Sequence, residues 1–169
     1  MKQLFTGALC MLLLISCQSN QKAADSNTSN QVTMKKVKFN SEGAQLTGNL
    51  FLPANFDSQQ KYPTIVVSGS WTTVKEQMAG LYAQRLANEG FITLAFDFRN
   101  FGESEGEPRF YESPALKKTD IQNAVSYLTT LPEVDHDKVG VFGVCAGAMY
   151  SLMAASEDER IQSLVTTAS

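Results

Sequence analysis

Short runs of apolar residues alternate with amphipathic segments along this sequence, and this alternation constrains its fold more than any other feature. A strand covered on both faces reads as a nearly continuous apolar run, as Thr64–Val67 does. The sequence predicts strands at 64–67, 91–98, 139–144 and 163–167, the first two of them buried, and helices at 76–89, 114–132 and 146–156. Strands that alternate with helices form a mainly parallel sheet with helices on both faces. We therefore expect an α/β fold organised as a three-layer sandwich.

A different pattern opens the folded part of the chain, at about Thr33. Val37 and Phe39 alternate with polar neighbours, and apolar residues alternate again in the stretch 46–52, after a short turn at Ser41–Gly43. Alternation with a period of two is typical of a strand that buries one face. The sequence therefore predicts an N-terminal antiparallel hairpin ahead of the parallel strands.

The spacing of apolar residues also predicts which faces of two helices are buried. The face expected for the first helix consists of Met78, Leu81, Tyr82 and Leu86, and Gly90 is placed to end that helix. The face expected for the second consists of Ile121, Ala124, Val125 and Leu128. Pro114 is suited to the first turn of this second helix, because its missing N–H needs no partner there.

The N-terminus resembles an export signal rather than part of the fold. The apolar run Leu4–Ile15 has about 12 residues at about 1.5 Å each, far short of a bilayer core of roughly 30 Å. It ends in Leu14-Ile15-Ser16-Cys17, which resembles the lipobox of bacterial lipoproteins, where cleavage precedes an acylated cysteine. We expect residues 1–16 to be a signal peptide and Cys17 to carry lipid. The alternative is an ordinary secretory signal with an incidental cysteine.

The stretch 17–32 contains Ser, Asn, Gln and Ala and too few large apolar residues to fold, so we expect a flexible tether. The domain proper would then be 33–169, exported and lipid-anchored to a bacterial membrane on its periplasmic or cell-surface face. Acyl carbons contribute about 0.8 kcal/mol each to such anchoring. The membrane is thus one expected partner, reached through the lipid.

Composition narrows the chemistry further. If Cys10 leaves with the signal and Cys17 carries lipid, Cys145 is the one free thiol and no disulfide can form within the chain. The net charge of −3 and the scattered Lys and Arg residues give no nucleic-acid signature. With a single histidine and no Cys/His cluster, we expect no metal site, and no cofactor is indicated.

The most informative motif is Gly143-Val144-Cys145-Ala146-Gly147, between an expected strand and an expected helix. It matches the G-x-S-x-G nucleophile elbow with cysteine in the serine position. In such a turn Gly143 and Gly147 avoid collisions, and the partial positive charge of the helix N-terminus favours the reactive thiolate. The amide of Ala146 would then point at the developing oxyanion. The alternative is a small buried cysteine that ends a strand.

A second loop follows the strand 64–67, with the sequence Ser68-Gly69-Ser70-Trp71. In the elbow architecture a loop at this place donates the second oxyanion amide, so Ser70 or Trp71 is the candidate donor. The other interpretation is an ordinary tight turn covered by an aromatic side chain.

Taken together, these motifs resemble the α/β-hydrolase superfamily in its dienelactone-hydrolase-like branch, where cysteine can replace the nucleophilic serine. The resemblance covers about 37–169, and the segments that carry it are Val74–Gln77, Leu81–Ala87, Phe96–Arg99, Phe101–Ser104 and the elbow. It implies structural or pocket-forming roles for Asp97, Arg99 and Ser104. Glu76 is a weaker candidate for an acidic neighbour of the thiol, against the alternative of a carboxylate in the first turn of a helix.

The resemblance also implies a triad in the order nucleophile, acid, histidine, with the acid and histidine after the elbow. The one histidine here, His136, precedes the elbow at the other end of a strand, roughly 20 Å away at about 3.3 Å per residue. Proton transfer needs about 3 Å, so we expect His136 to be a surface turn residue. We therefore expect an incomplete α/β-hydrolase fold, an N-terminal portion that stops before the acid and the histidine.

The leading functional hypothesis is hydrolysis of a small carbonyl substrate, an ester, lactone or thioester, through Cys145. One alternative is a non-catalytic, surface-anchored remnant or binding domain. A second is a peptidase-like hydrolase, which the cysteine at the elbow disfavours. Substrate identity does not follow from the fold.

Overall fold

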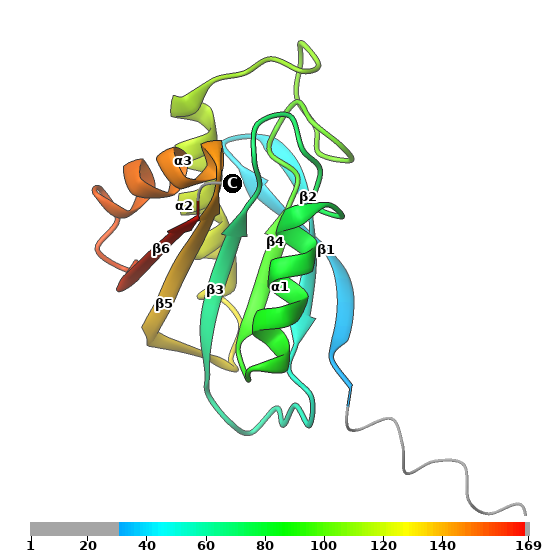
Figure 1. Cartoon of the computed structure of the whole chain (residues 1–169), viewed down its shortest axis with the longest axis vertical. Helices are drawn as coiled ribbons and strands as arrows, with labels where there is room; N and C mark the ends of the chain where they lie inside the picture. The colour runs from blue at the N-terminus through cyan, green and yellow to red at the C-terminus, as the bar shows by residue number, and fades with distance from the viewer. Residues whose placement is uncertain (1–30, 168–169) are drawn as a thin grey trace, which may run out of the picture.

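The structure is a computed structural model, and it describes residues 31–167 (Figure 1). Its elements are β1 (Thr33–Ser41), β2 (Ala44–Leu52), β3 (Tyr62–Ser68), α1 (Met78–Asn88), β4 (Ile92–Phe96), α2 (Pro114–Leu128), β5 (Val134–Val144), α3 (Ala146–Ala155) and β6 (Ser163–Thr167). The predicted signal peptide, Cys17 and most of the predicted tether lie outside the described residues. Within those residues, no helix combines the length and the apolar character that a membrane span requires.

Six strands form one sheet in the order β1-β2-β4-β3-β5-β6. The β1–β2 hairpin is antiparallel, with Ser41 opposite Ala44, and β2 pairs antiparallel with β4. The pairs β3–β4, β3–β5 and β5–β6 are parallel. The predicted hairpin and the predicted mainly parallel sheet are both confirmed. Because β3 to β6 run in one direction, the loops that follow β3, β4 and β5 leave the same edge of the sheet, the upper edge in Figure 1.

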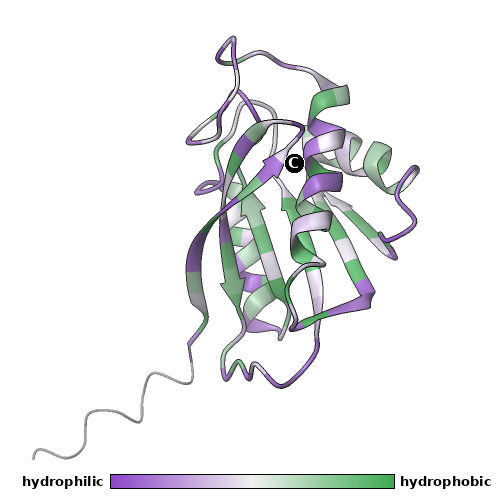
Figure 2. Ribbon diagram, turned by 180° about the vertical axis from the view of Figure 1, so that it is seen from behind, coloured by the Kyte–Doolittle hydropathy of each residue, from purple (hydrophilic) through white to green (hydrophobic). Residues whose placement is uncertain are grey.

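Helices cover both faces of this sheet, which completes the predicted three layers. Helix α1 packs on β2, β3 and β4, whereas α2 and α3 contact each other on the opposite face. Figure 2 shows that second face, with mostly hydrophobic central strands beneath the two helices and hydrophilic residues along β1 and the loops. The larger buried apolar cluster lies there and the smaller one lies under α1.

The face of α1 that is buried differs from the predicted one. Leu81 is 48% exposed, while Ala79, Ala83 and Ala87 are completely or almost completely buried against the sheet. Small residues spaced by four allow the helix axis to approach the strands closely, so the alanines form the contact face. Larger neighbours such as Leu86 lie at its margin. Sequence hydrophobicity identified the helix but placed its contact face one residue away.

Helix α2 follows its prediction closely. Ser113 is the N-cap and its hydroxyl accepts a hydrogen bond from the N–H of Leu116, with Pro114 in the first turn. All four predicted apolar residues are fully buried, from Ile121 to Leu128. The same helix also buries Lys117 and Asp120, which apolar spacing does not predict.

The amino end of β5 is longer than predicted. Tyr62 of β3 pairs with Val134, but the next pair joins Thr64 to Val139, so β5 carries extra residues between its two pairs. These extra residues include His136, which is exposed. The prediction that His136 lies at the surface is confirmed, but it belongs to β5 and not to a turn, because β5 already begins at Val134.

Candidate active site

Cys145 occupies the turn between β5 and α3, at the sheet edge where the parallel strands end. Its backbone has φ 53° and ψ −118°, in the positive-φ region that residues other than glycine rarely adopt. Its side chain is exposed. A strained backbone at an exposed, chemically reactive side chain is typical of functional sites, where the surrounding structure maintains the strain.

Two close approaches show why glycine flanks this turn. A Cβ added at Gly143 would stand 2.6 Å from the Cα of Ala148, in the first turn of α3. A Cβ added at Gly147 would stand 2.4 Å from the carbonyl oxygen of Gly69 and 2.6 Å from that of Ser68. Because the obstacles are backbone atoms, neither position can take a side chain without moving the chain.

The second contact of Gly147 joins the elbow to the loop after β3. The hydroxyl of Ser68 donates to the carbonyl oxygen of Gly147 at 3.0 Å and lies 2.8 Å from the hydroxyl of Ser151 in α3. The structure therefore brings together the two segments that the sequence proposed as one site. Ser70 follows this contact directly and is half-buried, and Trp71 is 60% exposed.

The amides around Cys145 divide into two groups. The N–H of Cys145 donates to the carbonyl oxygen of Thr167 at 2.8 Å, so it is occupied by the pairing with β6. Ala146 is the first residue of α3, a position whose N–H has no partner within a helix. The N–H of Ala146 is thus available next to the thiol in sequence, and its role as an oxyanion donor stays a prediction.

A buried ionic cluster lies where the loop after β3 meets the loop after β4, and Lys75 is at its centre. The Lys75 side chain is 1% exposed, and its Nζ lies 2.8 Å from Asp97, 2.7 Å from Glu103 and 2.8 Å from Glu76. Glu76 therefore pairs with Lys75 in this structure. The hypothesis that Glu76 is an acidic neighbour of the thiol gains no support from this geometry.

Charges in this cluster hold one another in the ionised form. Burial lowers the pKa of Lys75, but hydrogen bonds to Asp97, Glu103 and Glu76 outweigh burial and raise it above its ordinary value. Hydrogen bonds from Lys36 and Lys75 lower the pKa of Glu103 to about 2. Lys36 lies on β1, so the cluster connects the outer hairpin to the loops after β3 and β4.

The neighbouring polar residues of the loop after β4 have structural partners. Asp120 is fully buried and accepts from the Arg99 backbone N–H, from the Arg99 side chain and from the hydroxyl of Ser41. Ser104 donates to the carbonyl oxygen of Asp97 at 2.6 Å and accepts from the N–H of Thr47. These contacts fit the structural roles that the family resemblance implies for Asp97, Arg99 and Ser104.

A second buried lysine lies on the other face of the sheet. Lys117 has its Nζ 2.7 Å from Glu112 and within 4.6 to 5.0 Å of the ring centres of Phe98, Phe101 and Tyr150. The Tyr150 hydroxyl donates to the other carboxylate oxygen of Glu112 at 2.6 Å. Burial lowers the pKa of Lys117, and the Glu112 carboxylate only partly opposes this. Burial and the hydrogen bond to Glu112 raise the pKa of Tyr150.

Sequence reasoning missed both lysine clusters. Lys75 stands within the Val74–Gln77 segment that carries the family resemblance, which was one available signal. Another was the occurrence of Lys117 between buried apolar positions of α2. Neither signal identifies the distant partners, such as Asp97 and Glu103 for Lys75 and Tyr150 for Lys117, because these come from other segments of the chain.

The structure does not bring a histidine to Cys145 from the described range. His136 belongs to the amino end of β5, and Cys145 follows its carboxyl end. Within residues 31–167, no group of three or more His, Cys, Asp or Glu is arranged to hold a metal ion. Chemically, the arrangement offers an exposed thiol, the first amide of a helix and a second loop in contact with the elbow.

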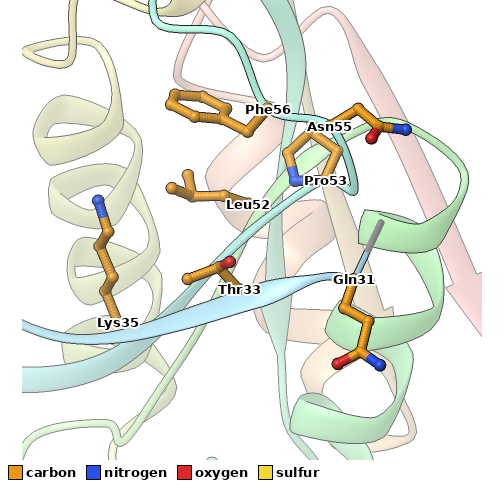
Figure 3. A pocket seen from close by; sticks show the side chains of 7 residues that line it. All are labelled: Gln31, Thr33, Lys35, Leu52, Pro53, Asn55 and Phe56. Atoms are coloured by element: carbon orange, nitrogen blue, oxygen red, sulfur yellow. The ribbon is translucent and has the colours of Figure 1, made fainter. Parts of the chain in front are cut away.

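A hollow of about 240 Å³ lies at the opposite edge of the sheet, beside the start of β1 and the end of β2 (Figure 3). Its lining consists of Gln31, Thr33, Lys35, Leu52, Pro53, Asn55 and Phe56. Among these side chains only Lys35 is ionisable, so the hollow holds no nucleophile with a base. The elbow remains the stronger candidate.

Comparison with known proteins agrees with this geometry. The family model described as esterase FrsA-like matches residues 13–169. The chain is 43% identical over 134 residues to the uncharacterized protein YcjY of Escherichia coli (strain K12), which is 78% of this chain and 44% of YcjY. It spans 48% of the Pseudomonas aeruginosa protein PA2218, so it covers about half the length of these curated relatives.

Solved structures show the same architecture. The crystal structure of the hypothetical protein PA2218 from Pseudomonas aeruginosa aligns with a TM-score of 0.78 and 41% identity, over 80% of this chain and 42% of that chain. The dienelactone hydrolase-like promiscuous phosphotriesterase P91, from metagenomic libraries, aligns with a TM-score of 0.69 and 25% identity, over 82% and 59%. The predicted fold class and the predicted resemblance are thereby confirmed.

Proposed function

The chain belongs to the FrsA-like esterase family, so it is a hydrolase by family, and from this premise we propose that it cleaves small carbonyl compounds through Cys145. The substrates would be esters, lactones or thioesters. The observation that carries the proposal is the positive φ of Cys145 at an exposed thiol between a strand and a helix. A cysteine that merely filled space would need neither strain nor exposure.

The geometry supports a covalent mechanism. The Cys145 sulfur would attack the carbonyl carbon, and the electron pair of the C=O bond would move to oxygen. The N–H of Ala146 and an N–H from Ser70 or Trp71 would stabilise that oxyanion. Collapse would expel an alkoxide or thiolate and leave an acyl thioester on Cys145, which water would hydrolyse.

A base must accept the thiol proton in this mechanism. Among residues 31–167, the one histidine lies at the opposite edge of the sheet, so the proposal assigns no base within that range. Because the chain spans about half the length of its curated relatives, the activity and substrates of the whole protein are part of the proposal.

A thiol-directed acylating probe tests the nucleophile. We expect the wild-type protein to acquire an acyl adduct that peptide mass spectrometry maps to Cys145, and we expect the Cys145→Ser variant to lack it. The matched control is the Cys10→Ser/Cys17→Ser double variant, which keeps Cys145 and should label like the wild type. Equal labelling of wild type and Cys145→Ser would overturn the proposal and favour a non-catalytic binding domain.

We also propose that Cys17 carries a lipid and anchors the protein to a bacterial membrane. The support is the sequence Leu14-Ile15-Ser16-Cys17 alone, because these residues lie outside the described range. We expect Cys17→Ala to abolish incorporation of labelled fatty acid in cells, with Cys145→Ser as a control that retains it. Unchanged membrane partitioning of Cys17→Ala would contradict the anchor.

A further inference from the structure

The loop between β3 and α1 carries the candidate donors Ser70 and Trp71, and it is fixed at both of its ends. At its start, Ser68 bonds to the carbonyl oxygen of Gly147 and contacts Ser151, both in α3. At its far end, Lys75 bonds to Asp97 at the end of β4. The two ends are thus held by different elements of the same sheet edge.

Lys75 makes its contact with Asp97 through two different atoms. Its backbone N–H donates to Oδ1 of Asp97 at 2.7 Å, and its own Nζ donates to Oδ2 at 2.8 Å. Oδ2 also accepts from the N–H of Glu103 at 2.9 Å. Two bonds from one residue to one carboxylate fix both the position and the direction of the backbone at Lys75.

Little conformational freedom remains between these anchors. The Thr73 hydroxyl donates to the carbonyl oxygen of Ser70 at 2.9 Å, and Thr72 has φ 58°, which closes a tight turn. Beyond Lys75, a Cβ added at Gly80 would stand 2.5 Å from the Lys75 carbonyl oxygen, so α1 packs directly on this residue. The orientation of the Ser70 and Trp71 amides therefore depends on where Lys75 is held.

The ion pairs between Lys75 and its carboxylates also argue against a role in fold stability alone. A buried ion pair is weak evidence for stability, because replacing both partners with apolar side chains of similar volume often costs nothing, although removing one partner alone leaves an uncompensated charge. An apolar residue at position 75 could fill the space, but it could not join Asp97, Glu103 and Glu76. What the ammonium adds is direction and the connection of two loops.

We propose that Lys75 is a positioning residue: held by Asp97 and Glu103, it fixes the amides of Ser70 and Trp71 relative to Cys145 so that they meet the oxyanion already oriented. This inference rests on the proposed function, because it assigns a purpose to the loop in that reaction. Donors that are aligned before the reaction need no reorganisation when charge develops on oxygen.

Trp71 is the only tryptophan of the chain, so its fluorescence reports on this loop alone. We expect Lys75→Met, in the full-length protein, to increase the fast local motion of Trp71 in time-resolved anisotropy. The matched control is Lys117→Met, which removes another buried, carboxylate-paired lysine from a different region and should leave Trp71 unchanged. Lys75→Arg keeps the charge and should restore most of the wild-type anisotropy.

Hydrolysis of p-nitrophenyl acetate adds a second readout. We expect Lys75→Met to lower kcat by about 10²-fold with little change in KM, because misplacing a donor by about 1 Å weakens the transition state more than substrate binding. Should Lys75→Met fail to fold, Glu103→Gln removes one carboxylate that holds the Lys75 ammonium and should increase Trp71 motion by a smaller amount, whereas unchanged motion in that variant would overturn the positioning role.

The outcomes separate this inference from the proposed function. Unchanged Trp71 motion in a folded Lys75→Met variant, or an equal change in Lys117→Met, would overturn the positioning role while labelling at Cys145 could still stand. Increased Trp71 motion in a protein whose Cys145 is never acylated would leave Lys75 as a loop anchor and overturn its part in catalysis.

Discussion

Lys75 and Lys117 are the same residue type with almost the same burial, at 1% and 2% side-chain exposure, yet their pKa values are shifted in opposite directions. Lys75 is surrounded by three carboxylates, and its pKa is raised. Lys117 has one carboxylate and three aromatic rings, and its pKa is lowered because burial disfavours its charged form.

This difference shows what compensates a buried charge. Ionised oxygens at 2.7 to 2.8 Å more than offset the loss of water around Lys75. Ring faces about 5 Å away add a weaker attraction and cannot replace two further carboxylates. Depth of burial alone therefore predicts neither the charge state of a lysine nor the consequence of removing it.

Removing Lys75 is expected to destabilise the protein more than any other change considered below. We expect Lys75→Met to lower the free energy of unfolding by about 3–5 kcal/mol, because it leaves the fully buried Asp97 without its cation. Urea denaturation at pH 7 measures this. A loss no larger than that of Lys117→Met would contradict this expectation, since it would mean that the three carboxylates around Lys75 do not make its removal more costly than that of Lys117.

Removing Lys117 is expected to change the stability much less. Lys117→Met should change the free energy of unfolding by only about 1 kcal/mol at pH 7, because the lost attractions are balanced by the removed cost of burying charge. We expect the Tyr150 hydroxyl, which donates to Glu112 in the wild type, to keep that bond in the variant, and urea denaturation at pH 7 measures the change.

The opposite pKa shifts of the two lysines also predict opposite dependences of stability on pH. The pKa of Lys117 is lower folded than unfolded, so the unfolded state binds more protons between the two values and Lys117 becomes less destabilising as pH rises. The wild type should therefore gain stability relative to Lys117→Met as pH rises toward the pKa of an unfolded lysine, about 10.4. Lys75 has the opposite sign: its contribution is complete below its unfolded pKa and is lost as pH rises from that value through its raised folded pKa. If the difference in free energy of unfolding between wild type and Lys117→Met stayed constant with pH, it would contradict a lowered pKa for Lys117.

The sequence predicted the parts of the molecule that depend on periodicity. The hairpin, the order of strands and helices and the face of α2 all follow from patterns of apolar residues, and the structure confirms them. The contact face of α1 was wrong because alanines carry little hydrophobic signal, although they decide how closely a helix approaches a sheet.

The candidate site was predictable only in its local part. The elbow occupies five consecutive residues, so its turn can be recognised directly from the sequence. The contact between Gly147 and the carbonyl of Gly69, and the partners of Lys75, join segments that are distant in sequence. No local pattern specifies such partners, because they depend on strand order and on the register of β3 against β5.

The hydrogen bond from the Cys145 N–H to Thr167 limits how the elbow can be transplanted. The unusual backbone of Cys145 is restrained from outside the pentapeptide, by the carbonyl of the neighbouring strand and by the tight packing of Gly147 on the end of β3. Grafted alone onto another strand–helix junction, Gly143–Gly147 would relax to an ordinary turn. A protein engineer would have to transfer the ends of β3, β5 and β6 together, because the conformation of Cys145 depends on how they are arranged and not on the five-residue sequence alone.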